Sequence, residues 1–180
     1  MISPHRTPHR SLSGTSRRSP RESPRRSLPL TLSLLTVLFA AVGCSSSVTV
    51  AAPAPEGQAA RACRALHGEL PQTVDGLARR TADPDSDFTA AWGDPAVRLR
   101  CGVAKPDVLR FGSEHYNPKA DAAAVDGVEW LFEKRDDGYR FTTVLRKAYV
   151  EVSVPGKYAP EVNVLTDLAN AVKKTVPEGV

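Results

Sequence analysis

The chain has 180 residues, enough for one ordinary domain, and 24 basic against 20 acidic side chains give it a formal charge of +4. The positive charge belongs to residues 1–29, which contain seven arginines and one acid, Glu22. Without these residues the chain has 17 basic and 19 acidic side chains, a formal charge of −2, which argues against a nucleic-acid partner.

An uncharged apolar run over residues 28–42 follows the arginine-rich start. This order is typical of a signal peptide, because the cationic start stays on the cytoplasmic side while the apolar run inserts. The run is shorter than the roughly 20 apolar residues of a membrane span. We predict a signal peptide over residues 1–43. Arginine pairs at 17–18 and 25–26 leave the general secretory and twin-arginine routes both open.

Three small or apolar residues, Ala41, Val42 and Gly43, stand directly before Cys44. They resemble the lipobox of bacterial lipoproteins, in which the cysteine is acylated and the chain is cut before it, although most lipoboxes have Leu in the place of Ala41. The resemblance implies that a lipid on Cys44 holds the protein on the extracytoplasmic face of the cell membrane. An uncleaved apolar helix, ordinary secretion and a buried cysteine are the alternatives.

Residues 44–58 are small, uncharged up to Glu56, and interrupted by two prolines. Such a composition offers little apolar surface for a core, so we predict that residues 44–58 form a flexible tether after the lipidated cysteine. The globular extracytoplasmic domain is then expected over residues 59–180.

Two cysteines, Cys63 and Cys101, remain once Cys44 is assigned to the lipid. Outside the cytoplasm two such cysteines usually pair, so we predict a structural disulfide. A redox-active pair or a metal site is the alternative. Redox pairs usually stand two residues apart and metal sites need more ligands nearby, and neither pattern is present.

The secondary-structure signals of the domain begin with helix formers over 59–70, a short turn near 74–78 and a loop over 81–86. Strict alternation of apolar and polar residues predicts a strand over 97–103. Three further strands are predicted over 128–134, 139–145 and 148–154, the first two joined by the hairpin signal Asp137-Gly138. Helical spacing of apolar residues predicts a last helix over 160–175.

These elements predict an α+β fold. An antiparallel sheet of about four strands is expected to pack on the N- and C-terminal helices, which cover one side of it. Cys63 would lie on a helix and Cys101 on a strand, joined by the one disulfide.

Short motifs at 92–95, 99–103, 127–130 and 149–155 resemble those of a family of actinobacterial exported proteins, a domain of unknown function. The resemblance covers about residues 60–177. It implies a place in the cell envelope, as a lipoprotein or membrane-anchored protein, and a paired use of Cys63 and Cys101. It implies no activity.

Motifs that carry chemistry are missing after Cys44: the sequence has no nucleophile elbow and no glycine-rich phosphate loop, and its two histidines, His67 and His115, are far apart. We therefore predict no catalytic residue, no metal and no cofactor. His115 follows Glu114 in a polar loop and is the best candidate for proton chemistry if the domain is an enzyme.

Three residues are candidates for a ligand surface: Trp92, Arg100 and His115. Trp92 precedes a turn, where a large aromatic side chain can remain open to a ligand. Arg100 lies at a polar strand position, and with the other strand arginines it either forms a face for anionic ligands or is simply solvated. These other arginines are Arg98, Arg140 and Arg146.

Two functions follow from these observations. The first is a membrane-anchored envelope lipoprotein whose domain binds an envelope protein or a cell-wall partner without catalysis. The second is an extracytoplasmic enzyme of unrecognised type that acts on an envelope substrate through His115, Glu114 and nearby acids.

Overall fold

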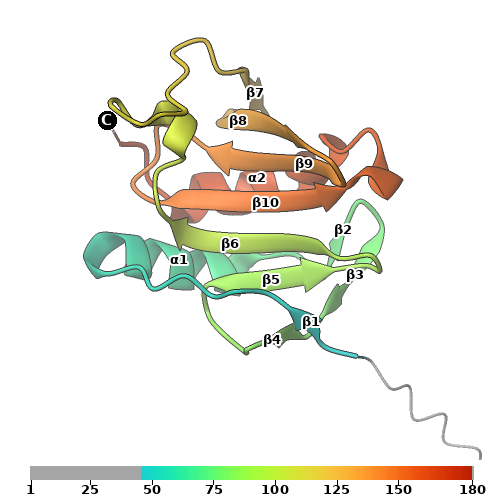
Figure 1. Ribbon diagram of the computed structural model, residues 1–180. Coiled ribbons are helices and arrows are strands. Elements are labelled where there is room, and N and C mark those ends of the chain that lie inside the picture. The colour runs from blue at the N-terminus through green and yellow to red at the C-terminus, as the bar shows by residue number, and fades with distance from the viewer. Residues whose placement is uncertain (1–45, 180) are drawn as a thin grey trace, which may run out of the picture. The chain divides into compact units, whose positions relative to one another are not determined.

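The computed structural model describes residues 46–179, so the predicted signal peptide and Cys44 lie outside the described residues. The main element is an eight-stranded antiparallel sheet with two helices on one face (Figure 1). The strand order is β2-β3-β5-β6-β10-β9-β8-β7. The bounds are β2 Thr73–Val74, β3 Leu77–Arg80, β5 Thr89–Trp92, β6 Val97–Val103, β10 Tyr149–Pro155, β9 Gly138–Thr143, β8 Val128–Arg135 and β7 Ala122–Val125.

The predicted α+β class is confirmed, and the four predicted strands are β6, β10, β9 and β8, which lie side by side at the centre of the sheet. The sheet has eight strands where the sequence predicted about four. The additional strands are two to four residues long, too short for alternation to stand out. The turn predicted near 74–78 is the tip of the hairpin that joins β2 to β3.

Helices α1, Gly57–Glu69, and α2, Asn163–Thr175, lie on the same face of the sheet (Figure 1). We call this the covered face and the opposite one the open face. Leu66 of α1 and Leu168 of α2 are fully buried in a core cluster that also contains Leu99 of β6. The predicted helices are confirmed, and their apolar stripes are the reason that they pack against the sheet.

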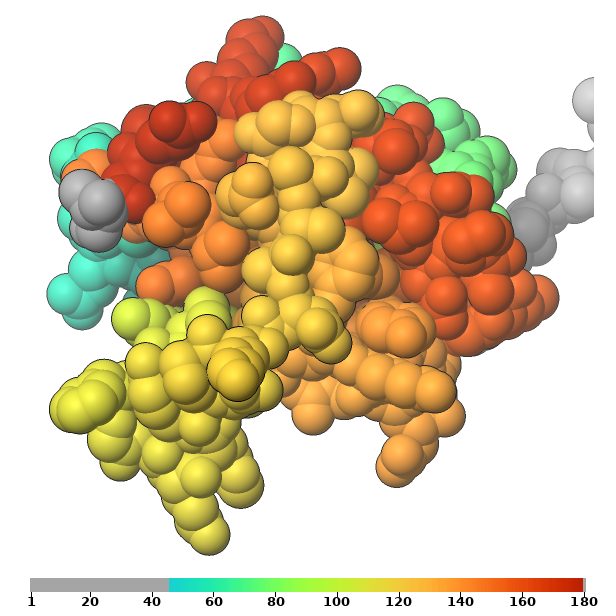
Figure 2. All heavy atoms as spheres, turned by 90° about the horizontal axis from the view of Figure 1, so that it is seen from above, coloured from blue at the N-terminus to red at the C-terminus, as the bar shows by residue number. Residues whose placement is uncertain are grey.

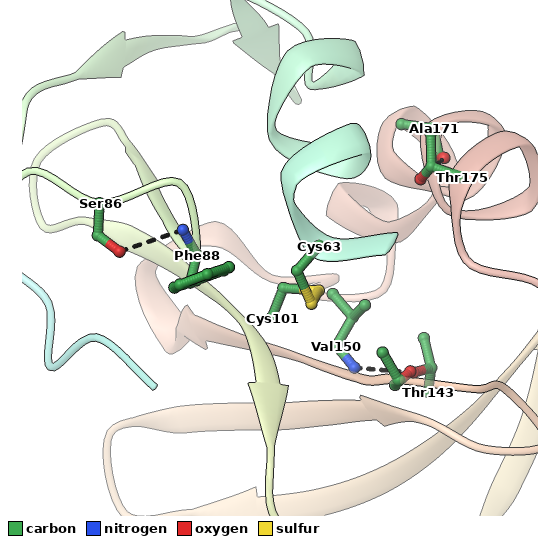
Figure 3. The surroundings of a disulfide bond; sticks show 9 residues. Cys63, Ser86, Phe88, Cys101, Thr143, Val150, Ala171 and Thr175 are labelled. Carbon is green, nitrogen blue, oxygen red and sulfur yellow. Dashed lines mark hydrogen bonds between the residues drawn. A yellow bond between two sulfur atoms is a disulfide. The ribbon is translucent and has the colours of Figure 1, made fainter. Parts of the chain in front are cut away.

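A disulfide joins Cys63 of α1 to Cys101 of β6, with 5.5 Å between the two Cα atoms, as predicted (Figure 3). Both cysteines are buried in the covered-face core. The bond closes a separation of 38 residues, so it ties the N-terminal helix to the centre of the sheet.

Residues 46–56 lie along the open face beside β5, and do not form the flexible tether predicted for 44–58 (Figure 1). Strand β1, Val48–Thr49, pairs in parallel with β4, Ala82–Asp83. Val50 is 2% exposed and packs on Ala91 and Ala96. The prediction is wrong for this part, because Val48, Val50 and the backbone of the segment find partners beside the sheet that composition alone does not reveal.

The close approach of this segment to β6 depends on a glycine. Gly102 has a φ of +87°, and a Cβ atom at this position would lie 2.5 Å from Pro55. The guanidinium of Arg100 also holds the segment, since its Nε donates to the carbonyl of Ala51 at 2.8 Å.

A second segment, residues 104–121, connects β6 to β7. It contains the 3₁₀ helix η1, Asp107–Leu109, and is held by its own backbone hydrogen bonds, such as Asn117 N to the carbonyl of Val108 at 2.9 Å. Figure 2 shows the yellow residues of this loop projecting from one side of the molecule.

Candidate functional site

A pocket of 980 Å³ opens on the open face of the sheet, between the N-terminal segment and the loop 104–121. Strands β6, β10, β9 and β8 provide its floor, and the two segments provide its walls. Pro53 and Ala54 line one wall, and Val108 lines the other. Its volume lies at the upper end of the range of small-molecule pockets.

The floor is positioned by the register of three neighbouring strands. Glu151 of β10 is the cross-strand partner of Arg100 on β6 and of Thr142 on β9. Cross-strand partners point to the same side of a sheet, so all three side chains lie on the open face. Arg140 reaches the same side because it stands two residues before Thr142. Period-two alternation therefore places the apolar neighbours of these residues on the covered face.

A bulge at the start of β10 adjusts this register between Tyr149 and Val150. On the other side of β10, the side-chain oxygen of Thr143, the last residue of β9, accepts a hydrogen bond from the backbone N–H of Val150 at 2.9 Å (Figure 3). The strand is thereby fixed one residue before Glu151.

Glu151 is the acidic centre of the floor and its side chain is 12% exposed. Its Oε1 accepts a hydrogen bond from Arg100 Nη1 at 3.0 Å, and its Oε2 lies 3.6 Å from Arg140 Nε. At the edge of the pocket Arg135 pairs with Glu133 at 2.8 Å. One carboxylate thus faces two guanidinium groups, which leaves one positive charge in excess on the floor.

Two polar atoms of the floor are buried without a hydrogen-bond partner among residues 46–179: Thr142 Oγ1 and Arg140 Nε. Thr142 as a whole is 1% exposed. A buried polar group without a partner costs about 1–3 kcal/mol, so such groups are uncommon and usually call for water or a ligand. Both atoms lie below the pocket surface and are closed to solvent, so a ligand reaches them once the side chains around them shift.

Comparison with known families matches residues 27–180 to a family described as proteins of unknown function (DUF3515). The chain belongs to this family. The DUF3515 match includes the whole sheet, both helices and every residue of the pocket, and it also includes Cys44. No curated protein and no solved structure matches the chain significantly.

Two of the three predicted ligand-surface residues of this DUF3515 domain, Arg100 and His115, line the pocket. His115 is an exposed residue of the wall, and its backbone N–H donates to Ser113 Oγ at 3.3 Å. Arg100 and His115 are 15 positions apart in the sequence, and the loop that follows β6 brings His115 to the same pocket.

The prediction for Trp92 is wrong. Trp92 is 0% exposed, belongs to the covered-face core, and donates from Nε1 to the carbonyl of Pro71 at 3.1 Å. Strand β5 places it opposite Val97 on β6, so it points toward the helices. The short strand was not recognised in the sequence, and without it the turn that follows suggested an open position.

The other strand arginines separate into different environments. Arg140 lines the pocket, whereas Arg98 is exposed on the same face outside it. Arg146 donates to the carbonyl of Val176 at 3.0 Å and holds the C-terminal residues.

Sequence reasoning missed Glu151 and Thr142. Glu151 was detectable as a lone acid between two inward-facing valines, but only the strand register shows what it contacts.

Two side chains with shifted pKa values lie outside the pocket. Burial lowers the pKa of Arg79 and raises the pKa of Tyr149, and neither residue lines the pocket.

Residues 46–179 contain no group of three or more His, Cys, Asp or Glu side chains that could hold a metal ion. Within the same residues, neither helix is long and apolar enough to cross a membrane.

Proposed function

We propose that this DUF3515 protein is a cell-envelope lipoprotein whose outer domain binds a ligand in the open-face pocket without catalysis. The observation that carries the binding role is the pocket floor, where a buried hydroxyl and a guanidinium N–H have no partner among the described residues. Unpaired buried groups reduce the stability of a fold, and a bound ligand would offset that cost. The domain is therefore better adapted to a filled pocket than to an empty one.

The outer location rests on the sequence. The arginine-rich start, the apolar run and Cys44 support export and lipidation, and the resemblance to exported actinobacterial proteins supports the same place in the cell. Lipidation would hold the protein on the extracytoplasmic face of the cell membrane.

The packed N-terminal segment gives this anchor a specific geometry. Arg80 Nη2 donates to the carbonyl of Ser46 at 2.6 Å, so the chain is attached to the domain from Ser46 onward. Only Ser45 separates Ser46 from Cys44. Because each residue spans at most about 3.6 Å, a lipid on Cys44 would hold the domain within about 7 Å of its attachment point. The domain would then lie against the membrane surface.

Mass spectrometry of the membrane fraction tests the anchor. We expect an N-terminal peptide that begins at Cys44 and carries diacylglycerol, and we expect Cys44→Ala to abolish acylation, with Ser45→Ala as the matched control. An unmodified Cys44 in a chain that still contains residues 30–42 would show an uncleaved helix instead. A free chain that begins downstream would show ordinary secretion.

Native mass spectrometry of the full chain, purified from membranes, tests the binding role. We expect a bound small molecule whose mass is the same after prolonged incubation, and its loss when Arg100 is replaced by Gln. Absence of any bound mass, together with no change in envelope composition in a deletion strain, would contradict the proposal.

An extracytoplasmic enzyme is the second candidate, and the position of His115 in the pocket wall favours it. The pocket places this histidine in the same cavity as the carboxylates of Glu133 and Glu151. Conversion of the co-purified molecule by the wild type but not by His115→Gln would support catalysis. An unconverted molecule would support binding alone.

A further inference from the structure

We propose that the floor of the pocket binds an oxyanion, the carboxylate or phosphate group of the ligand, between Thr142 Oγ1 and Arg140 Nε. This inference rests on the proposed binding function and specifies the chemistry of the ligand. Thr142 is 1% exposed, lines the pocket, and has an unpaired hydroxyl, so the site combines a cavity with a buried polar side chain in its floor.

The hydrogen-bonding groups select an acceptor. Arg140 Nε carries a proton and can only donate, which excludes an ammonium or amide N–H of the ligand at this point. The Thr142 hydroxyl can donate as well, so the chemistry of both atoms suits an oxyanion. Glu151 does not satisfy Arg140 Nε, since the distance to its Oε2 is 3.6 Å, beyond hydrogen-bond distance.

The charges select a negative ligand group. Four cationic side chains line the pocket, Arg100, Lys105, Arg135 and Arg140, against the three acids Asp107, Glu133 and Glu151. Asp107 is itself paired with Arg110 outside the pocket, and Glu133 with Arg135. Arg100 and Arg140 therefore share the single carboxylate of Glu151, and a ligand oxyanion supplies the missing negative charge.

The walls indicate that the oxyanion is one end of a larger molecule. An isolated phosphate or carboxylate occupies a small part of a 980 Å³ pocket. Above the floor, the walls combine apolar residues, Pro53, Ala54 and Val108, with polar ones, Lys105, His115 and Asn117. The rest of the ligand is thus expected to carry polar groups as well as apolar surface.

Calorimetric titration of the full chain in a phosphate-free buffer tests the proposal, with inorganic phosphate and acetate as separate probes. We expect saturable binding of at least one probe, and the probe that binds identifies the source as phosphate or carboxylate. Thr142→Val removes the hydroxyl and keeps the shape of the side chain. We expect it to weaken binding about tenfold or more, because a hydrogen bond to a charged group is lost.

Arg140→Gln is expected to weaken binding at least as much, whereas Arg98→Gln, the matched control on the same face outside the pocket, should leave it within about twofold. The melting temperature of Thr142→Val should equal or exceed that of the wild type, because an unpaired buried hydroxyl is removed.

Binding of neither probe, or equal binding by Thr142→Val, would overturn the proposal. So would an equal loss in Arg98→Gln, since that result would indicate attraction by net charge alone. A co-purified molecule retained by a protein that binds neither probe would overturn the oxyanion site and leave the proposed binding function intact.

Discussion

The two faces of the sheet are formed by the same strands but differ in the contacts that their side chains make. On the covered face, Leu99 and Val152 are at most 1% exposed, and the core they share with the helices is almost entirely apolar. On the open face, their chain neighbours Arg100 and Glu151 form an ion pair at 3.0 Å, beside a hydroxyl without a partner. Adjacent residues of one strand thus meet opposite environments.

From this difference we expect the covered face to determine the stability of the fold and the open face to determine ligand binding. Apolar burial and the disulfide stabilise the covered face, whose core also buries one polar atom without a partner among the described residues, Trp130 Nε1. The open-face floor contains unpaired polar atoms and excess charge, which lower stability unless something binds there. Changes on the covered face should therefore alter unfolding, and changes on the open face should mainly alter binding.

Removal of the disulfide should have the largest effect. Replacing Cys63 and Cys101 by Ala is expected to lower the free energy of unfolding by about 4 kcal/mol, the loop-closure value for a separation of this length. Chemical denaturation measures it, with dithiothreitol-treated wild type as the control. Where the variant is still folded, its affinity for the probe that binds the wild type, phosphate or acetate, should be unchanged. A tenfold weaker affinity would contradict the expectation that changes on the covered face leave binding on the open face unaltered.

Glu151→Gln should have an effect of intermediate size, with lower stability and stronger anion binding. Loss of the charge-assisted bond to Arg100 is expected to reduce stability by about 1–2 kcal/mol, discounted because Arg100 is 34% exposed. Anion affinity should rise, because two guanidinium groups then lack their carboxylate. Thermal denaturation and calorimetry measure the two effects. Weaker anion binding by this variant would contradict the charge argument.

The smallest effect is expected in the projecting loop. Phe111 is 89% exposed, so Phe111→Ser should change the free energy of unfolding by no more than about 0.5 kcal/mol. Its ring contacts Tyr116 edge-on at 5.7 Å, and Tyr116→Ser provides a matched comparison. A loss above about 2 kcal/mol in either variant would show that the loop supports the fold more than its exposure indicates.

Sequence patterns predicted the covered face well and the open face poorly. Alternation in β6 and β10 and helical spacing in α2 depend only on local order, and the cysteine count predicted the disulfide. The pocket arises from register: Glu151 meets Arg100 and Thr142 only when three strands pair in a particular alignment. Trp92 and the N-terminal segment were mispredicted because both depend on pairing of strands too short to produce a pattern.

The most direct test of the two-face account is an amide chemical-shift map of the full chain titrated with the anion, phosphate or acetate, that binds in calorimetry. We expect saturable shifts at residues 140–142, 151 and 100–108, with α1 and α2 unchanged apart from small effects near Cys63. Shifts that centre on the helices, or that are spread over all exposed basic residues without saturation, would contradict the account.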